Sequence, residues 1–312
     1  MAFKLTILTF HRVTTVPYFI PPMAVHEKTF VRLIKRLPLL GCVMALPHAV
    51  AKIKNGTLKG NCFAITFDDG YADNYMVAAK ILSYFNMPAT FFVPVLQINT
   101  NAVFWWDYIY SIVESDASRF HAWICDAGVG KLLNNHTEQA LLAREIVQIF
   151  NGMTNEKRLS ILDRMSLTFG EYSGSRLLMN WDEIKHLGYR GFEIGSHTVS
   201  HIPLTDLSDE DAIIEIAQSK KYLSEKIGLE VSGFCYPRGA FSRQHLKMVE
   251  KSQYKYAVST RFGNNSAGSD IYALSRRTMA DYPDFRNHLA PEFQLLELSG
   301  IFDRILLKRR IA

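Results

Sequence analysis

The chain is poor in cysteine, in long apolar runs and in clustered basic residues, and each shortage excludes a class of protein. Four of the 312 residues are cysteines, and no two of them form the C-x-x-C pair of a structural zinc site or a dithiol redox centre. Charged residues interrupt the apolar runs, so we expect no membrane-spanning helix. The net charge of +5 is mildly basic. No nucleic-acid-binding motif or basic stripe accompanies it, and we expect no nucleic-acid partner.

Targeting signals, internal repeats and low-complexity tracts are also absent. The first ten residues lack the basic head, the long apolar stretch and the cleavage site of a secretion signal, so we expect a cytoplasmic protein. Hydrophobic residues make up 48% and charged residues 21% of the chain, as in a globular protein. We expect a single domain over residues 1–312, because α/β barrels often run past about 200 residues.

Strand-like and helix-like segments alternate along most of the chain. Apolar and β-forming residues predict strands over residues 4–11, 62–67, 89–93, 191–196, 231–236 and 256–259. Periodicity and capping residues predict helices over residues 26–37, 73–85, 208–228 and 242–251. This alternation predicts an α/β fold with a mainly parallel sheet, either open or closed into a barrel.

Residues 97–180 break the alternation. They contain an aromatic segment, residues 104–110, followed by helical stretches over residues 136–150 and 155–169. No segment rich in Gly, Pro or Ser flanks them, and such a segment is what usually marks a domain boundary. We therefore interpret residues 97–180 as a helical insertion packed on the barrel.

Polar side chains follow four of the predicted strands. His11 comes at the end of the first strand, Asp68 and Asp69 follow the second, His197 follows a later one, and Tyr236 ends the next. Catalytic groups in parallel α/β folds lie at the carboxyl ends of the strands. We expect these side chains to share one face of the sheet.

Asp69, His197 and His201 have the composition of a hydrolytic metal site. Two imidazoles and one carboxylate leave a coordination position open for water or substrate. The adjacent ionised carboxylates of Asp68 and Asp69 repel each other, and a cation relieves that repulsion. We predict that Asp69 binds the metal and that Asp68 faces the attacking water. Taken alone, Asp-Asp-Gly is more typical of a turn, and the two histidines are typical of a surface pair.

Residues 234–242 predict a strand, a sharp turn and the start of a helix. A backbone N–H near Arg238 is a candidate to stabilise an oxyanion. The alternative interpretation is a simple connection between the strand and the helix.

Three motifs resemble, in order, the first three motifs of the polysaccharide deacetylase (NodB-homology) family. They are Thr66-Phe67-Asp68-Asp69-Gly70, His197-Thr198-Val199-Ser200-His201 and Tyr236-Pro237-Arg238-Gly239. The resemblance spans residues 4–280 without the helical insertion. It implies a distorted (β/α) barrel that removes N- or O-acetyl groups from sugars with a divalent metal, usually zinc.

The same resemblance implies a role for individual residues. Asp68 corresponds to the general base, and Asp69, His197 and His201 correspond to the metal ligands. The segment Thr9-Phe10-His11-Arg12-Val13 is similar to an early signature of the poly-N-acetylglucosamine deacetylases of biofilm formation. In that permuted branch the acid histidine comes first, which implies that His11 is the general acid.

One position departs from the family pattern. Cys235 stands where the family usually has an arginine that braces the base. Arg276 and Arg277 are candidates to replace that arginine.

The resemblance implies an acetylated amino-sugar glycan as the substrate. For a cytoplasmic enzyme, a lipid-linked or nucleotide-linked precursor of a surface polysaccharide fits best. Tyr236, Pro237, Trp105 and Trp106 are candidates for substrate contact, since aromatic rings stack on sugars. Aromatic clusters are nevertheless more often part of a core.

Residues 291–312 alternate apolar and polar positions and end in a basic run. They predict a basic amphipathic helix, which either contacts an anionic membrane surface or packs on the barrel as a closing helix.

Two other functions stay open from the sequence. One is an O-acetyl esterase or another amide hydrolase on the same metal site. The other is a non-catalytic glycan-binding barrel, which Cys235 motivates and the intact base and metal motifs disfavour.

Overall fold

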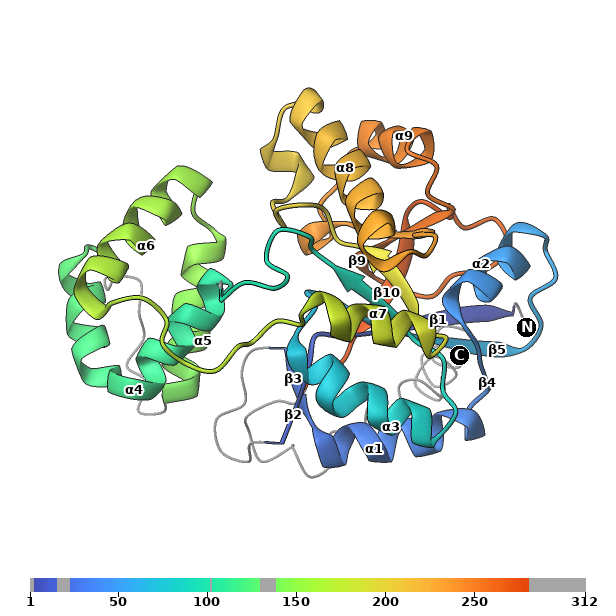
Figure 1. The fold of residues 1–312 in the computed structure, drawn as a ribbon, viewed down its shortest axis with the longest axis horizontal. Coiled ribbons are helices and arrows are strands. Elements are labelled where there is room, and N and C mark those ends of the chain that lie inside the picture. Colours follow the sequence, from blue (N-terminus) through green and yellow to red (C-terminus); the bar gives the residue numbers. More distant parts are fainter. Residues whose placement is uncertain (1–2, 16–22, 102, 130–138, 281–312) are drawn as a thin grey trace, which may run out of the picture. The chain divides into compact units, whose positions relative to one another are not determined.

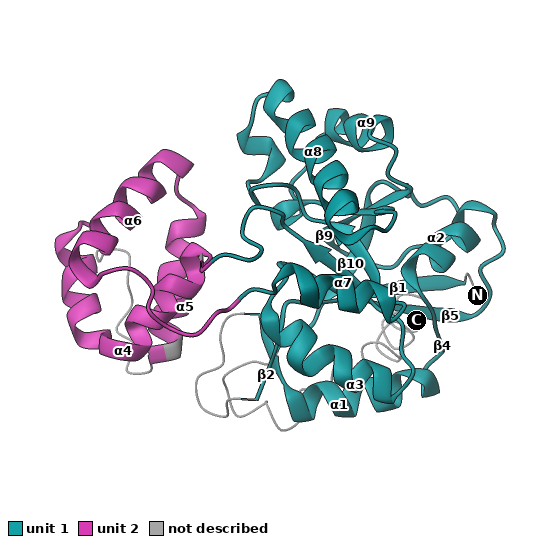
Figure 2. Ribbon diagram, in the orientation of Figure 1, with its two compact units in different colours: residues 1–15, 23–100, 178–312 teal, residues 16–22, 101–177 magenta. Residues whose placement is uncertain are grey.

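The computed structural model describes residues 3–15, 23–101, 103–129 and 139–280. The chain divides into two compact units, shown in teal and magenta in Figure 2. Residues 1–15, 23–100 and 178–312 form the first, which we call the barrel unit. Residues 16–22 and 101–177 form the second, which we call the helical unit.

The parallel strands of the barrel unit form a sheet that closes on itself, because β5 pairs with β1 as well as with β6. Helices lie around these strands (Figure 1). Going around the barrel, the order is β1, β10, β9, β8, β7, β6 and β5, and β5 pairs again with β1. Their bounds are Lys4–Phe10 (β1), Asn61–Phe67 (β5), Thr90–Val93 (β6), Glu193–Ser196 (β7), Gly233–Cys235 (β8), Tyr256–Phe262 (β9) and Leu274–Thr278 (β10). The pairing of β1 with β5 runs in register from Lys4↔Asn61 to Phe10↔Phe67. The predicted α/β barrel is therefore confirmed, and in its closed form.

Short strands and helices complete the barrel unit. Strand β4 (Cys42–Val43) pairs with the start of β5, and β2 (Arg12–Thr14) pairs with β3 (Ala24–His26) in a separate small sheet. The helices are α1 (Glu27–Arg36), α2 (Leu46–Lys54), α3 (Ala79–Tyr84), α7 (Trp181–Tyr189), α8 (Asp209–Ile227) and α9 (Arg243–Lys251). Single turns cover Leu37–Leu39, Asn74–Ala78, Leu204–Asp206 and Pro237–Gly239.

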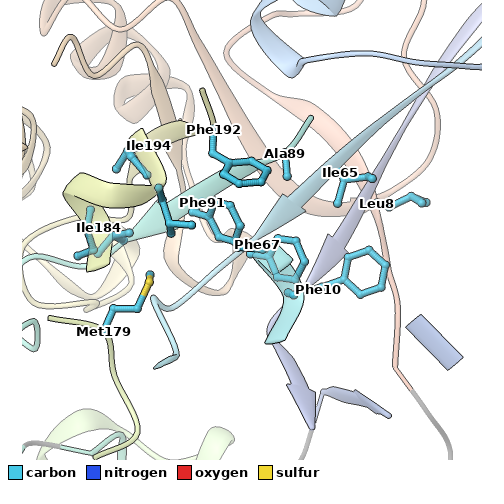
Figure 3. Packing of buried hydrophobic residues seen from close by; sticks show 14 of the residues in the cluster. Leu8, Phe10, Ile65, Phe67, Ala89, Phe91, Met179, Ile184, Phe192 and Ile194 are labelled. Atoms are coloured by element: carbon cyan, nitrogen blue, oxygen red, sulfur yellow. The ribbon is translucent and has the colours of Figure 1, made fainter. Parts of the chain in front are cut away.

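Strand alternation divides the core of the barrel unit into two layers, because successive side chains point to opposite faces of the sheet. Leu5 and Ile7 of β1 belong to a core cluster with Tyr256 and Val258 of β9. Leu8 and Phe10, on the opposite face of β1, belong to a second cluster that includes residues of the surrounding helices. Figure 3 shows this second cluster. In it, neighbouring strands stack Phe10 on Phe67 (5.4 Å between ring centroids) and Phe67 on Phe91 (4.9 Å).

The helical unit contains α4 (Trp105–Asp126), α5 (Gln139–Asn151) and α6 (Asn155–Phe169). Its helices bury a core of their own, which includes Ile109, Val113, Phe120, Ile146 and Phe150. The apolar faces of these helices pack against one another, so the unit has a separate core. The packing of this insertion on the barrel stays a prediction.

Two further features concern membranes. None of the helices among the described residues combines the length and the apolar character needed to cross a bilayer. The amphipathic helix predicted over residues 291–312 lies outside the described residues.

Candidate active site

The carboxyl ends of the barrel strands bring the predicted site residues to one edge. His11 follows β1, Asp68 and Asp69 follow β5, and His197 follows β7. Main-chain hydrogen bonds join these ends to their neighbours. The Asp68 N–H donates to the Phe10 carbonyl (3.0 Å), and the His197 N–H donates to the Val93 carbonyl (3.0 Å). All strands of the barrel run parallel, so residues far apart in sequence meet at this edge.

Three metal-ligating atoms lie close together, one each from Asp69, His197 and His201. Oδ1 of Asp69 lies 3.4 Å from Nε2 of His197 and 3.1 Å from Nε2 of His201, and ligand atoms of the three residues lie within 4.8 Å of one another. Nδ1 of His197 donates to the carbonyl oxygen of Cys235 at 2.8 Å. This bond turns Nε2 toward Asp69, the orientation that metal-ligating histidines commonly have.

Electrostatics favour the metal-binding forms of Asp69 and His201. At His197, burial alone lowers the pKa, but Cys235 and Asp69 outweigh it and hold that pKa well above its usual value. Burial alone raises the pKa of Asp69, but the imidazoles of His201 and His197 outweigh it and hold that pKa well below its usual value. Burial also lowers the pKa of His201, despite the neighbouring Asp69. An ionised carboxylate and a neutral imidazole are the ligand forms of these side chains.

The loop between the two histidines is strained and is held by Glu215. Thr198 and His201 have positive φ angles of 67° and 62°, which are unusual for non-glycine residues and most of all for a β-branched one. Oε2 of Glu215, on α8, accepts hydrogen bonds from the N–H groups of Val199 (2.7 Å) and Ser200 (2.9 Å), and Oε1 accepts one from the Ser200 hydroxyl (2.7 Å). Strain of this kind persists where the surroundings enforce it, often at functional sites.

A buried ion pair joins Asp68 to Arg276. Nη1 of Arg276 donates to Oδ1 of Asp68 at 2.8 Å, and Nη2 donates to Oδ2 at 2.6 Å. Arg276 is 1% exposed and Asp68 is 2% exposed. Burial alone raises the pKa of Asp68, but the charge and hydrogen bonds of Arg276 outweigh it and lower that pKa. Asp68 is therefore an ionised carboxylate in a fixed orientation.

The thiol of Cys235 lies against the same pair. Nη2 of Arg276 donates to Sγ of Cys235 at 3.1 Å, and the thiol approaches Oδ2 of Asp68 at 3.4 Å. The guanidinium of Arg277 instead lies over the ring of Phe262, 4.8 Å from its centroid. Of the two arginines considered from the sequence, Arg276 is the one that contacts Asp68.

His11 directly follows Phe10, whose carbonyl accepts the hydrogen bond from the Asp68 N–H. Its imidazole is close enough to contribute to the lowered pKa of both Asp68 and Asp69. Nδ1 of His11 is buried and has no hydrogen-bond partner among the described residues. The ring thus lies within electrostatic range of both carboxylates and makes no hydrogen bond through Nδ1 within the described part of the chain. Its role as the general acid stays a prediction.

The third motif forms a tight turn after β8. Tyr236 is fully buried, stacks on Phe241 and donates its hydroxyl proton to the carbonyl of Tyr272 at 3.0 Å. Arg238 has a φ of 56°, and its carbonyl accepts a hydrogen bond from the Thr260 hydroxyl at 3.1 Å. This arrangement gives the Tyr236 side chain a packing role. Substrate contact by Tyr236 or Pro237, and an oxyanion contact near Arg238, stay predictions.

Gly239 shows why this turn admits no larger residue. Its φ is 68°, and an added Cβ would lie 2.5 Å from the backbone nitrogen of Thr260. The close approach of the turn to β9 therefore requires glycine.

Trp105 and Trp106 belong to the helical unit and contact residues of that unit. Trp106 stacks on Phe104 at 4.5 Å between centroids, and Trp105 lies 5.9 Å from Phe150. The guanidinium of Arg158 lies 5.4 Å from the Trp105 centroid. Their predicted stacking on a sugar stays a prediction.

Comparison with known proteins identifies the family of this chain. The family model for polysaccharide deacetylases matches residues 55–123 and 154–257, more than half of the chain. The chain belongs to the polysaccharide deacetylase family. The matched residues include Asp68, Asp69, His197, His201 and Cys235, whereas His11 and Arg276 lie outside them.

Individual relatives are distant in sequence. YxkH of Bacillus subtilis (strain 168), which carries the name of a polysaccharide deacetylase, is 23% identical over 215 residues, 69% of this chain and 50% of YxkH. The chain thus spans about half the length of this curated relative.

Solved structures share the fold. Deacetylase PplD from Streptococcus pyogenes in complex with acetate is 19% identical, with a TM-score of 0.59 over 93% of this chain and 98% of PplD. IcaB from Ammonifex degensii is 17% identical, with a TM-score of 0.60 over 93% of this chain and 98% of IcaB.

Proposed function

We propose that this protein is a metal-dependent hydrolase that removes the acetyl group from an N-acetylated sugar of a glycan or glycan precursor. The observation that carries the proposal is the cluster of Asp69, His197 and His201 beside an Asp68 carboxylate that is held by Arg276. Membership of the polysaccharide deacetylase family supports an acetylated carbohydrate as the substrate class.

The three clustered side chains fit a divalent cation, and zinc in particular. Two imidazole nitrogens and one carboxylate oxygen converge, and the Cys235 carbonyl orients one imidazole from behind. Such a donor set is typical of catalytic zinc. When bound, the cation supplies Lewis acidity toward a carbonyl oxygen and lowers the pKa of water.

The chain's own residues then divide the proton transfers. Asp68, ionised and held by two hydrogen bonds from Arg276, accepts the proton of the attacking water. His11, on the neighbouring strand end, donates a proton to the leaving nitrogen. A backbone N–H near Arg238 stabilises the oxyanion of the tetrahedral intermediate. The products are acetate and the free amino sugar.

The finer identity of the substrate is part of the same proposal. We infer a lipid-linked or nucleotide-linked precursor of a surface polysaccharide, met in the cytoplasm. The similarity to YxkH, which carries the name of a polysaccharide deacetylase, supports a glycan substrate in general.

Metal analysis combined with acetate release tests the proposed function. Zinc-loaded wild-type protein is expected to release acetate from N-acetylated sugar oligomers, and a chelator is expected to abolish the release. Asp69→Ala and His197→Ala are each expected to lose stoichiometric zinc. His48→Ala, at an exposed position of α2, is the matched control and is expected to keep zinc and activity. Stoichiometric zinc in both site variants would show that the site is wrongly assigned. Release from O-acetylated sugars alone would identify an esterase.

A further inference from the structure

Residues 73 and 74 lie shortly after the two carboxylates that follow β5. Their side chains form hydrogen bonds with residues 11–13. Asn74 is fully buried. Its Nδ2 donates to the main-chain carbonyl of His11 at 2.8 Å and to Oδ1 of Asp73 at 3.1 Å. A buried side-chain amide that binds the backbone of another segment fixes the position of that segment.

Asp73 extends the same contact to the next two residues. Its Oδ2 accepts a hydrogen bond from Nε of Arg12 at 2.8 Å, and its Oδ1 accepts one from the N–H of Val13 at 3.2 Å. The guanidinium of Arg12 also lies over the ring of Tyr71, 4.8 Å from its centroid. Two consecutive residues, Asp73 and Asn74, thus hold three consecutive residues, 11–13.

The backbone at Asn74 is itself unusual. Residues Asn74–Ala78 form a π-helical turn that leads into α3. Such turns are rare and occur frequently at functional sites. Here the turn begins at the residue whose side chain reaches His11.

The hydrogen bonding of the His11 ring explains why the support of its main chain matters for the position of the ring. Nδ1 of the imidazole has no hydrogen-bond partner among the described residues, unlike Nδ1 of His197, which donates to the Cys235 carbonyl. The placement of the His11 ring therefore depends strongly on its own main chain, which Asn74 and Asp73 hold.

We propose that Asp73 and Asn74 are positioning residues that place the His11 imidazole at the reacting centre by fixing the main chain of residues 11–13. The inference rests on the proposed function, in which His11 protonates the leaving group. One segment, residues 68–74, then carries the base at its start and the support of the acid at its end.

The dependence of turnover on the leaving group tests this role. An amine leaves an acetamide only after protonation, so turnover of an N-acetylglucosamine oligomer needs the acid. The 4-nitrophenolate of 4-nitrophenyl acetate leaves as a stable anion and does not need it. Asn74→Ala is expected to lower kcat for the oligomer about 10- to 100-fold, part of the effect of a general acid, and to change kcat for the aryl ester about twofold or less. KM for the oligomer and the Kd for zinc are expected to stay at the wild-type values.

Three further variants make the test specific. His11→Ala is the reference and is expected to show the same selectivity with a larger loss. Asn55→Ala, at an exposed position after α2, is the control and is expected to match wild type on both substrates. Asp73→Asn keeps the shape of the side chain and is expected to show the selective loss even if Asn74→Ala does not fold.

The outcomes separate this inference from the proposed function. Equal loss on both substrates, or unchanged turnover of the oligomer, in both Asn74→Ala and Asp73→Asn would overturn the positioning role alone. A zinc-loaded wild type that releases no acetate from the oligomer would overturn the proposed function, and this inference with it.

Discussion

Replacing Arg276 by methionine should destabilise the barrel strongly and in a pH-dependent way. The guanidinium of Arg276 donates to both carboxylate oxygens of Asp68 and, through Nε, to the carbonyl of Ser259 at 2.8 Å. Methionine has a similar length but no charge. The variant therefore leaves the Asp68 carboxylate buried without its cationic partner.

The expected loss follows from the burial of the pair. Removing one partner of a buried ion pair costs about 3–5 kcal/mol of unfolding free energy, because the remaining charge stays uncompensated. In wild type, Arg276 lowers the pKa of Asp68. The contribution of the pair is thus present above the unfolded pKa of about 4 and is lost as the pH falls through the folded value. In the variant, burial raises the pKa of Asp68, so the folded state favours the protonated acid. The difference between the two proteins should be largest at neutral pH and should shrink in acid.

Urea unfolding of wild type and variants at pH 7 and in mild acid measures this difference. Arg277→Met is the matched control, because this guanidinium lies over Phe262, and we expect a loss of about 1 kcal/mol or less without the pH dependence. The double variant Asp68→Asn with Arg276→Met removes both charges and should regain much of the loss. Equal unfolding free energies for wild type and Arg276→Met at pH 7 would refute the reasoning. A double variant no more stable than the single one would refute it too.

Three other predictions address separate parts of the chain. Burial raises the pKa of Glu193 to about 7, although Thr90 and Tyr256 donate hydrogen bonds to it. The free energy of unfolding should therefore fall by up to about 3 kcal/mol as the pH rises from about 4.5 to about 7. Glu193→Gln should abolish that fall and should be more stable than wild type in urea unfolding at pH 8. Parallel curves of unfolding free energy against pH for the two proteins would contradict this. Glu215→Ala should weaken zinc binding about 10- to 100-fold in competition with a chromophoric chelator. Glu225→Ala, exposed on the same helix, should bind zinc like wild type, and equal affinities for the two variants would argue against the Glu215 support. His11→Ala should keep its zinc and lose about 10²- to 10⁴-fold of acetamide turnover; unchanged turnover would remove His11 from the mechanism.

The local sequence pattern was sufficient to predict the α/β architecture and the carboxyl edge of the sheet as the place of the site. Strand and helix periods are properties of neighbouring residues, and the predicted strand over 62–67 matches β5 (Asn61–Phe67) closely. Parallel strands share one carboxyl edge. The position of Asp69 and His197 after two strands was therefore enough to expect them side by side, as the structure places them.

Two features could not be predicted from local pattern because they depend on tertiary contacts. They are the closure of the barrel and the separate core of the helical unit. The pairing of β1 with β5 decides between an open and a closed sheet, and no local pattern encodes which distant strand lies at an edge. The apolar faces of α4, α5 and α6 pack with one another, but periodicity shows only that each face is buried and not what covers it.

The amino-acid sequence by itself determined the strand and helix order and the residue types of the candidate metal cluster, and the family resemblance pointed to the departure at Cys235. Only the tertiary structure decided which side chains support that cluster. Arg276 and Arg277 are adjacent in sequence, yet strand alternation turns one toward Asp68 and the other toward Phe262. Glu215 and Asn74 reach the histidine segments from other elements. The reason is physical: such contacts depend on strand register and side-chain direction across the fold, which spacing along the chain does not specify.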